Sequence, residues 1–316
     1  MSRYIRFIRL IGLMSLIGVT VALWHTVTAL AQSATPSLGL TLSPPTFEIT
    51  GNPGDTITNT VRLENTNDFP ISLAVDRRNF TAQGEEGSVG LTEEATAYSL
   101  ASWISVSPET TTIPGKTTRS FTYTISIPLN AEPGGHFGSL VFRTIPSAAL
   151  SGSGAALAQE IGSLILLNVS GYSIQDARIV DFEPTQSLFE YGPITLSARV
   201  ENLGNVHVKP SGTVTITNTF GSKVASLKVE GKNVLPGAIR KLETVWDNKW
   251  GFGRYTATFV MVYGTDLTQR AAVTNFYVFP YRLVLVIIVI ALVIGLVLYK
   301  MRKRLSLAWK ILTSSK

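Results

Sequence analysis

The sequence predicts an all-β protein built from two tandem Ig-like β-sandwiches, with an N-terminal signal helix and one C-terminal transmembrane helix. Three observations predict it: hydrophobic alternation with a period of two, an internal repeat, and an apolar run near each end. With 316 residues, the chain has room for about two domains.

The alternation is clearest in SFTYTISI, residues 120–127, where aromatic and aliphatic side chains alternate with Ser and Thr. Such a pattern places the apolar residues on the inner face of a strand and the polar residues in water. Comparable short segments recur between 38 and 279, separated by Pro-Gly, Asn-Asp and Gly-Asn pairs. Short strands with turn signals at roughly 8–12-residue spacing are typical of a β-sandwich.

The repeat pairs ITNTVRLENTND, residues 57–68, with ITLSARVENLGN, residues 194–205, and five of the twelve positions are identical. Each copy ends its strand with Glu-Asn, and we expect Asn65 and Asn202 to satisfy backbone groups at the turn that follows. The sequence therefore predicts that the two halves are related.

Two later elements recur in the same order. A Pro-Gly turn precedes a strand in both halves, at Pro114 and at Pro236. A glycine followed closely by an aromatic residue then opens a late strand, at 135–137 and at 253–255. We therefore predict related sandwiches at 38–172 and 173–279, and a mobile hairpin loop in the Gly/Ser/Ala-rich segment 147–158.

Residues 1–31 read as a signal peptide. Three arginines precede the apolar run 10–24, and Ala29-Leu30-Ala31 resembles a cleavage site, which makes residues 32–37 a linker. The alternative is an uncleaved anchor, but fifteen helical residues span only about 22 Å, short of a bilayer core of about 30 Å.

The second apolar run predicts a transmembrane helix at 280–299. No charge interrupts it from Leu283 to Tyr299. Tyr277, Phe279 and Tyr281 precede it as an aromatic belt. The basic tail 300–316 follows, beginning with Lys300, Arg302, Lys303 and Arg304. The positive-inside rule then puts the tail in the cytoplasm and residues 32–279 outside, with the helix in the plasma membrane.

The net charge of +6 is a property of the two ends. Ten of the 27 lysines and arginines lie in the first ten or the last 35 residues, whereas all 21 acidic residues lie between them. We therefore expect no nucleic-acid binding. The chain contains no cysteine, which for an exported protein favours a bacterial or archaeal surface.

The order of these features resembles the WxL-interacting proteins of bacterial surfaces. The resemblance rests on LSPPTFEITGNPGDTITNTVRLEN, on IPLNAEPGGHFGSLVF, and on a second sandwich with VLPGAIRKLETVW and GFGRYTATFVMVY before a single helix and a basic tail. It implies a peptidoglycan-binding first sandwich and a second sandwich that contacts host or partner proteins. The chain has no Trp-x-Leu motif, which suits a partner of such proteins.

No catalytic or cofactor motif is present. His136 and His207 lie in different halves, and the sequence lacks HExxH, GxSxG, P-loop and GxGxxG patterns. A calcium site at 64–68 is an alternative to a plain turn, although that segment lacks the DxDxDG spacing. We therefore predict no enzyme activity, no cofactor and no metal.

Trp103, Trp250 and Tyr255 are the candidate ligand or partner contacts, because aromatic faces stack on sugars and anchor protein interfaces. Core packing is the alternative for each tryptophan, and an exposed strand edge is another route to a partner. The sequence predicts a membrane-anchored, non-catalytic surface protein that holds cell-wall polymer (peptidoglycan), another surface protein, or both. The alternatives are a passive stalk or scaffold subunit and, more remotely, a hydrolytic enzyme.

Overall fold

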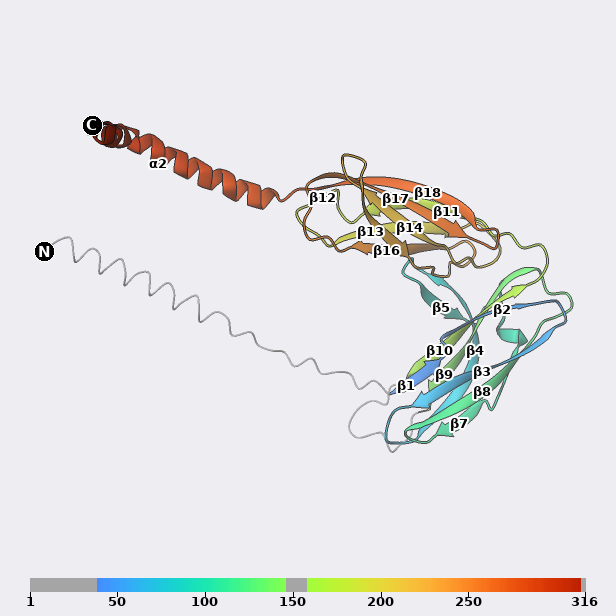
Figure 1. Cartoon of the computed structure of the whole chain (residues 1–316). Helices are drawn as coiled ribbons and strands as arrows, with labels where there is room; N and C mark the ends of the chain where they lie inside the picture. The colour runs from blue at the N-terminus through green and yellow to red at the C-terminus, as the bar shows by residue number, and fades with distance from the viewer. Residues whose placement is uncertain (1–38, 146–157, 314–316) are drawn as a thin grey trace. The chain divides into compact units, whose positions relative to one another are not determined.

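The computed structural model describes residues 39–145 and 158–313, the last twelve of these by their backbone alone. The predicted signal peptide and linker lie outside the described residues, as does the predicted loop 147–158 except for its last position. In the described part the chain forms two Ig-like β-sandwiches followed by one helix, which confirms the fold class expected from the alternation (Figure 1).

The first sandwich has two sheets. One sheet has the order β1-β3-β8-β6, and the other has the order β2-β10-β9-β4-β5, with β7 also pairing with β4. A short 3-10 helix, η1 (Ala101–Trp103), precedes β6. The strands are β1 (Leu40–Ser43), β2 (Thr46–Gly51), β3 (Thr56–Asn65), β4 (Ile71–Gln83), β5 (Ser88–Thr92), β6 (Ile104–Ser107), β7 (Thr110–Ile113), β8 (Thr117–Ser126), β9 (Gly134–Thr144) and β10 (Glu160–Val169).

The second sandwich has sheets of order β11-β13-β16 and β12-β18-β17-β14-β15. The strands are β11 (Ala177–Pro184), β12 (Leu188–Phe189), β13 (Ile194–Asn202), β14 (Ser211–Thr217), β15 (Lys223–Val229), β16 (Ile239–Trp246), β17 (Gly253–Tyr263) and β18 (Thr268–Val278).

The two sandwiches share one topology. The order β1-β3-β8 in the first corresponds to β11-β13-β16 in the second, and β2-β10-β9-β4-β5 corresponds to β12-β18-β17-β14-β15. In both copies the second strand pairs in parallel with the last, β2 with β10 and β12 with β18. The repeated segments of the sequence form β3 and β13, so the tandem relation is confirmed strand by strand.

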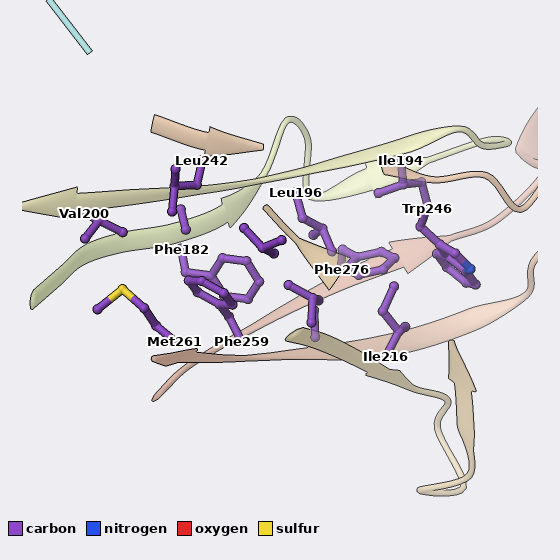
Figure 2. Close-up of a cluster of buried hydrophobic side chains, with 14 of the residues drawn as sticks. Phe182, Ile194, Leu196, Val200, Ile216, Leu242, Trp246, Phe259, Met261 and Phe276 are labelled. Atoms are coloured by element: carbon purple, nitrogen blue, oxygen red, sulfur yellow. The ribbon is translucent and has the colours of Figure 1, made fainter. Parts of the chain in front are cut away.

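The core of the second sandwich follows the alternation. Successive inward positions of β13 and β17 are fully or almost fully buried, and the aromatic rings pack edge to face. Figure 2 shows this cluster, whose labelled members are Phe182, Ile194, Leu196, Val200, Ile216, Leu242, Trp246, Phe259, Met261 and Phe276. Burial of each large side chain stabilises the fold by roughly 1.5–3 kcal/mol.

The two sandwiches belong to one compact unit, Leu40–Lys316, and contact each other directly. The carboxylate of Glu85, beyond the end of β4, accepts from Arg199 Nε at 2.8 Å, and its carbonyl oxygen accepts from the amide of Lys241 at 2.8 Å. Nearby, Phe80, Phe137 and Leu166 form a small buried cluster against which Leu235 packs.

The helix α2 runs from Tyr281 to Thr313. Its segment Tyr281–Met301 has a mean hydropathy of 3.0, and none of its most apolar stretch is buried. Among the described residues, this is the one helix that is long and apolar enough to cross a membrane. The predicted anchor residues Leu283 and Tyr299 lie within it and are exposed.

Candidate functional site

An open groove of about 580 Å³ lies on the first sandwich. Most of its lining is charged. The lining residues are Ala74, Val75, Asp76, Arg77, Arg78, Glu93, Glu109, Thr110 and Arg143.

Strand register brings the charges together on the outer face of one sheet. Asp76 and Arg78 are two residues apart in β4, so their side chains point to the same face. Arg143 in β9 lies opposite Ala74 on one side and opposite Glu160 of β10 on the other. Three strands from distant parts of the sequence therefore place four charged side chains side by side.

Ion pairs connect these side chains. Arg143 Nε lies 3.2 Å from Asp76 Oδ2, and Arg78 Nη2 lies 3.4 Å from Glu160 Oε1 and 3.7 Å from Asp76 Oδ2. At the rim, Arg77 Nη2 lies 3.1 Å from Glu109 Oε1. The pairs are partly exposed, with 26% of the Arg78 side chain and 41% of the Arg143 side chain accessible, so each contributes about 1 kcal/mol or less to folding.

The groove suits a polar ligand that carries carboxylates. A guanidinium offers five donors in a planar fork that matches a carboxylate in two-point contact. Arg77, Arg78 and Arg143 could exchange their present carboxylate partners for those of a ligand, and the free Asp76 and Glu109 could then receive ligand amines.

The three aromatic candidates from the sequence do not come together. Trp103 lies at the end of η1 in the first sandwich, where its half-buried ring packs against His136 with centroids 4.4 Å apart and the ring planes tilted by 42°. Trp250 lies in the loop between β16 and β17 of the second sandwich and is 64% exposed. Trp103 therefore remains a predicted contact near the first sandwich surface, and Trp250 remains available to a partner.

Tyr255 is a core residue. Its side chain is only 8% exposed and stacks on Phe276 with ring centroids 5.7 Å apart. Its hydroxyl oxygen accepts from the amide of Phe252 at 3.3 Å. Because the ring belongs to the buried core cluster of the second sandwich, Tyr255 is not available to a ligand.

The two histidines are held in structural positions. His136 is buried, and its ring nitrogens lie 3.3 Å from the carbonyl oxygen of Ser99 and 2.9 Å from that of Glu132. The ring of His207 lies edge-on to Phe137, and burial lowers the pKa of His207 below its usual value. Neither histidine is within the charged groove.

Segment 64–68, the alternative calcium site, leads into a turn that uses its polar side chains. The Oδ1 atom of Asn65 accepts from the backbone amide of Asn67 at 3.0 Å, and Asp68 pairs with Lys116 at 3.4 Å. In the described ranges, no group of three His, Cys, Asp or Glu side chains could hold a metal ion.

The groove residues are not among the contacts that the sequence predicts. The run Asp76-Arg77-Arg78 interrupts an otherwise apolar alternation in ISLAVDRRNF, which was the available signal. Arg143 and Glu160 could not be added to it, because their proximity depends on the pairing of β9 with β4 and β10.

Comparisons with known proteins show the fold alone. No family model matches the chain, and no curated protein matches it. Among solved structures, it is similar to the class 5 fimbriae chaperone CfaA, with 11% identity over 75% of this chain and 98% of that chain and a TM-score of 0.40. It is also similar to the Pseudomonas aeruginosa CupB2 chaperone, with 9% identity over 75% of this chain and 100% of that chain and a TM-score of 0.36. Similarity to the E. coli chaperone DraB extends over 76% of this chain and 97% of that chain, with 13% identity and a TM-score of 0.35. Likenesses of this strength carry no argument about ligand or partner.

Proposed function

We propose that this protein is a membrane-anchored, non-catalytic cell-surface binding protein whose first sandwich holds cell-wall polymer, namely peptidoglycan, in the charged groove. The observation that carries the proposal is an open, charged groove on a β-sandwich that is joined through a second sandwich to an exposed apolar helix.

The chemistry of peptidoglycan suits the groove. Its stem peptides carry free carboxylates and amines, and its glycan carries hydroxyl and amide groups. The groove lining offers three guanidiniums and three carboxylates, and a fourth carboxylate, that of Glu160, pairs with Arg78 beside it. The resemblance to WxL-interacting proteins implies the same ligand for the first sandwich.

The proposal places α2 across the plasma membrane as a single pass, with residues 32–279 outside and the basic residues from Lys300 onward in the cytoplasm. A helix of this length and hydropathy spans the roughly 30 Å hydrocarbon core. Lys300, Arg302, Lys303 and Arg304 give the bias that retains the C-terminus inside.

A partner surface protein is the second candidate ligand. The strand β15 lies at the end of the larger sheet of the second sandwich, and Val224 in it is 44% exposed. Such an edge presents backbone groups to which an extended segment of another chain can add as a strand.

Co-sedimentation with insoluble bacterial cell-wall sacculi tests the first proposal. The full chain in detergent micelles is expected to bind saturably. The double variant Arg78→Gln/Arg143→Gln is expected to lose at least ten-fold in affinity. Arg119→Gln is the matched control, because Arg119 is an exposed arginine of the same sandwich on the opposite sheet.

Equal binding by the double variant and the control would reject the groove as the site. No binding by the intact chain, with its β-structure verified by circular dichroism, would reject the wall ligand and leave a passive stalk or scaffold as the better reading.

A further inference from the structure

Exposed aromatic side chains gather at one end of the second sandwich. Phe220 is 90% exposed, Phe252 is 72% exposed and Trp250 is 64% exposed, and the less exposed Tyr191, Tyr277 and Tyr281 lie at the same end. We call these six residues the aromatic end. None of the first three is needed to fill the core, which Trp246, Tyr255 and Phe276 complete beneath them.

The strand pairings show that these residues share one end. Gly253, which follows Phe252, pairs with Val278 at the last position of β18. The turn that carries Phe220 is fastened to the same place, because Thr219 Oγ1 donates to the carbonyl oxygen of Arg254 at 2.9 Å.

Ring contacts join Trp250 and Phe252 to neighbouring aromatic residues. The rings of Tyr191 and Trp250 are edge to face with centroids 5.2 Å apart, and those of Phe252 and Phe279 are 5.3 Å apart. Phe279 is the residue that directly follows β18.

The apolar helix begins at this same end. Only Phe279 and Pro280 separate β18 from α2, which starts at Tyr281. The first turn of the helix is tied to the sandwich, because Arg282 donates its backbone amide to Glu190 Oε1 at 3.1 Å and its Nε lies 3.4 Å from Glu190 Oε2.

The position of the helix identifies what covers the aromatic end. If α2 spans a bilayer, the headgroup layer lies at about residue 281. Phe252 lies close to that level, because the next residue, Gly253, pairs with Val278 at the end of β18. Tryptophan and other aromatic side chains favour this layer, where their rings are removed from water while polar atoms stay hydrated. Lys223, Lys249 and Arg254 are exposed at the same end and would meet anionic headgroups.

We propose that the aromatic end of the second sandwich rests in the lipid headgroup layer, with Phe220, Trp250 and Phe252 inserted beside the first turn of α2. The second sandwich is then docked on the membrane surface rather than swinging above it. The inference rests on the proposed insertion of α2, and it assigns Trp250 to lipid instead of to a wall or protein ligand.

Site-directed spin labelling tests this directly, because the chain contains no cysteine and each introduced cysteine is unique. Phe252→Cys and Phe220→Cys variants of the full chain are labelled with a nitroxide and reconstituted into vesicles of phosphatidylethanolamine and phosphatidylglycerol. Power saturation compares accessibility to oxygen, which concentrates in lipid, with accessibility to a water-soluble nickel chelate.

Two matched sites calibrate the measurement. Val289→Cys, within α2, reports lipid, and Leu267→Cys, which is 67% exposed in the turn between β17 and β18, reports water at the opposite end of the sandwich. We expect the labels at 252 and 220 to favour oxygen over nickel, between the values at 289 and 267.

Labels at 252 and 220 that match position 267 while position 289 reports lipid would overturn the docking and leave the membrane anchor intact. A label at 289 that reports water would overturn both the anchor and the docking. Quenching by brominated lipids gives a second readout: Trp250→Phe is expected to remove a quenched component of the fluorescence, and Trp103→Phe is not.

Discussion

Asn65 and Asn202 occupy the same position in the two repeats and make the same hydrogen bonds from completely buried side chains. Each Nδ2 donates to the carbonyl oxygen four residues ahead, at 2.9 Å to Phe69 and 2.8 Å to Val206. Each also reaches a carbonyl just before the Pro-Gly turn, at 3.1 Å to Ile113 and 2.8 Å to Val234.

The oxygen of each side chain completes the pattern. Asn65 Oδ1 accepts from the amide of Asn67 at 3.0 Å, and Asn202 Oδ1 accepts from the amide of Gly204 at 2.8 Å. One amide group therefore fastens the end of β3 or β13 to the turn that precedes β8 or β16. This set of bonds explains why both repeats have Asn at this position. The longer side chain of Gln would not fit the same three partners.

Replacing Asn202 is expected to destabilise the second sandwich. In Asn202→Ala, buried carbonyl and amide groups lose their partner, and each such group costs about 1–3 kcal/mol. We expect a loss of at least about 2 kcal/mol in the free energy of unfolding, measured by urea denaturation followed by circular dichroism. Asn275→Ala is the control, since Asn275 is exposed and accepts one bond from Thr256; an equal loss in both variants would contradict the role assigned to Asn202.

Removing the hydroxyl of Tyr123 is expected to be neutral or stabilising. Its side chain is only 1% exposed, its hydroxyl has no hydrogen-bond partner among the described residues, and burial raises its pKa. In Tyr123→Phe the desolvation cost of the hydroxyl disappears, so the melting temperature should hold or rise.

Tyr263→Phe is the matched control for that variant. Tyr263 is equally enclosed, but its hydroxyl donates to Asp176 Oδ1 at 3.0 Å. We expect this variant to lose about 1 kcal/mol, the usual contribution of such a bond. A larger loss in Tyr123→Phe than in Tyr263→Phe would show that the Tyr123 hydroxyl has a partner.

The burial of His207 predicts a dependence of stability on pH. Because its folded pKa is lowered by desolvation, the unfolded chain binds the proton more readily. The contribution of neutral His207 to stability is therefore complete above pH 6.5 and declines as the pH falls below that value. In His207→Gln, the denaturation midpoint is expected to depend less on pH between pH 7 and pH 5.

Glu48 separates that effect from carboxylate titration. Hydrogen bonding from Asn233 and the charge of Lys209 lower the pKa of Glu48, so its contribution is present above pH 4.5 and is lost as the pH falls further. Glu48→Gln should remove the change below that value. Because the charge of Glu48 raises the pKa of His207, the variant should also steepen the change between pH 7 and pH 5 rather than flatten it. A profile between pH 7 and pH 5 that is unchanged in His207→Gln would exclude His207 as its source.

Gly204 is expected to tolerate no side chain. A Cβ at this position would collide with the carbonyl oxygen of Ile174, which is part of the backbone and cannot move aside alone. Gly204→Ala should therefore lower the melting temperature of the second sandwich by several degrees in a calorimetric scan. Gly90 lies in β5 of the first sandwich, where the nearest atoms to an added Cβ are at ordinary contact distance, so Gly90→Ala should change the melting temperature of that sandwich by no more than about two degrees.

The alternation and the repeat were sufficient to predict the sandwiches, because both depend on local sequence. They would also have placed Tyr255 in the core, since it shares its parity with Ala257, Phe259 and Met261, which are all fully buried. The split first strand was not predictable in this way. The division into β1 and β2, and the parallel pairing of β2 with β10, depend on contacts between the two ends of the domain.

The groove was beyond prediction for a related reason. Its charges come from β4, β9 and the segment around Glu109, and no sequence spacing reveals that these segments lie side by side. The lipid-facing role proposed for Trp250 also needed structure, because Phe220 and Trp250 are brought to one end only by the pairing of β14 with β17.

The last strand of the second sandwich has a mechanical consequence. The chain enters this sandwich beside the turn between β17 and β18, where Gln175 accepts from the amide of Thr265, and it leaves at the opposite end through Val278. Tension between a ligand held outside and a helix held in the membrane would therefore run along the strands. Because β18 is bonded to β17 on one side and to β12 on the other, that tension would load its ladder bonds together in shear instead of opening them one after another.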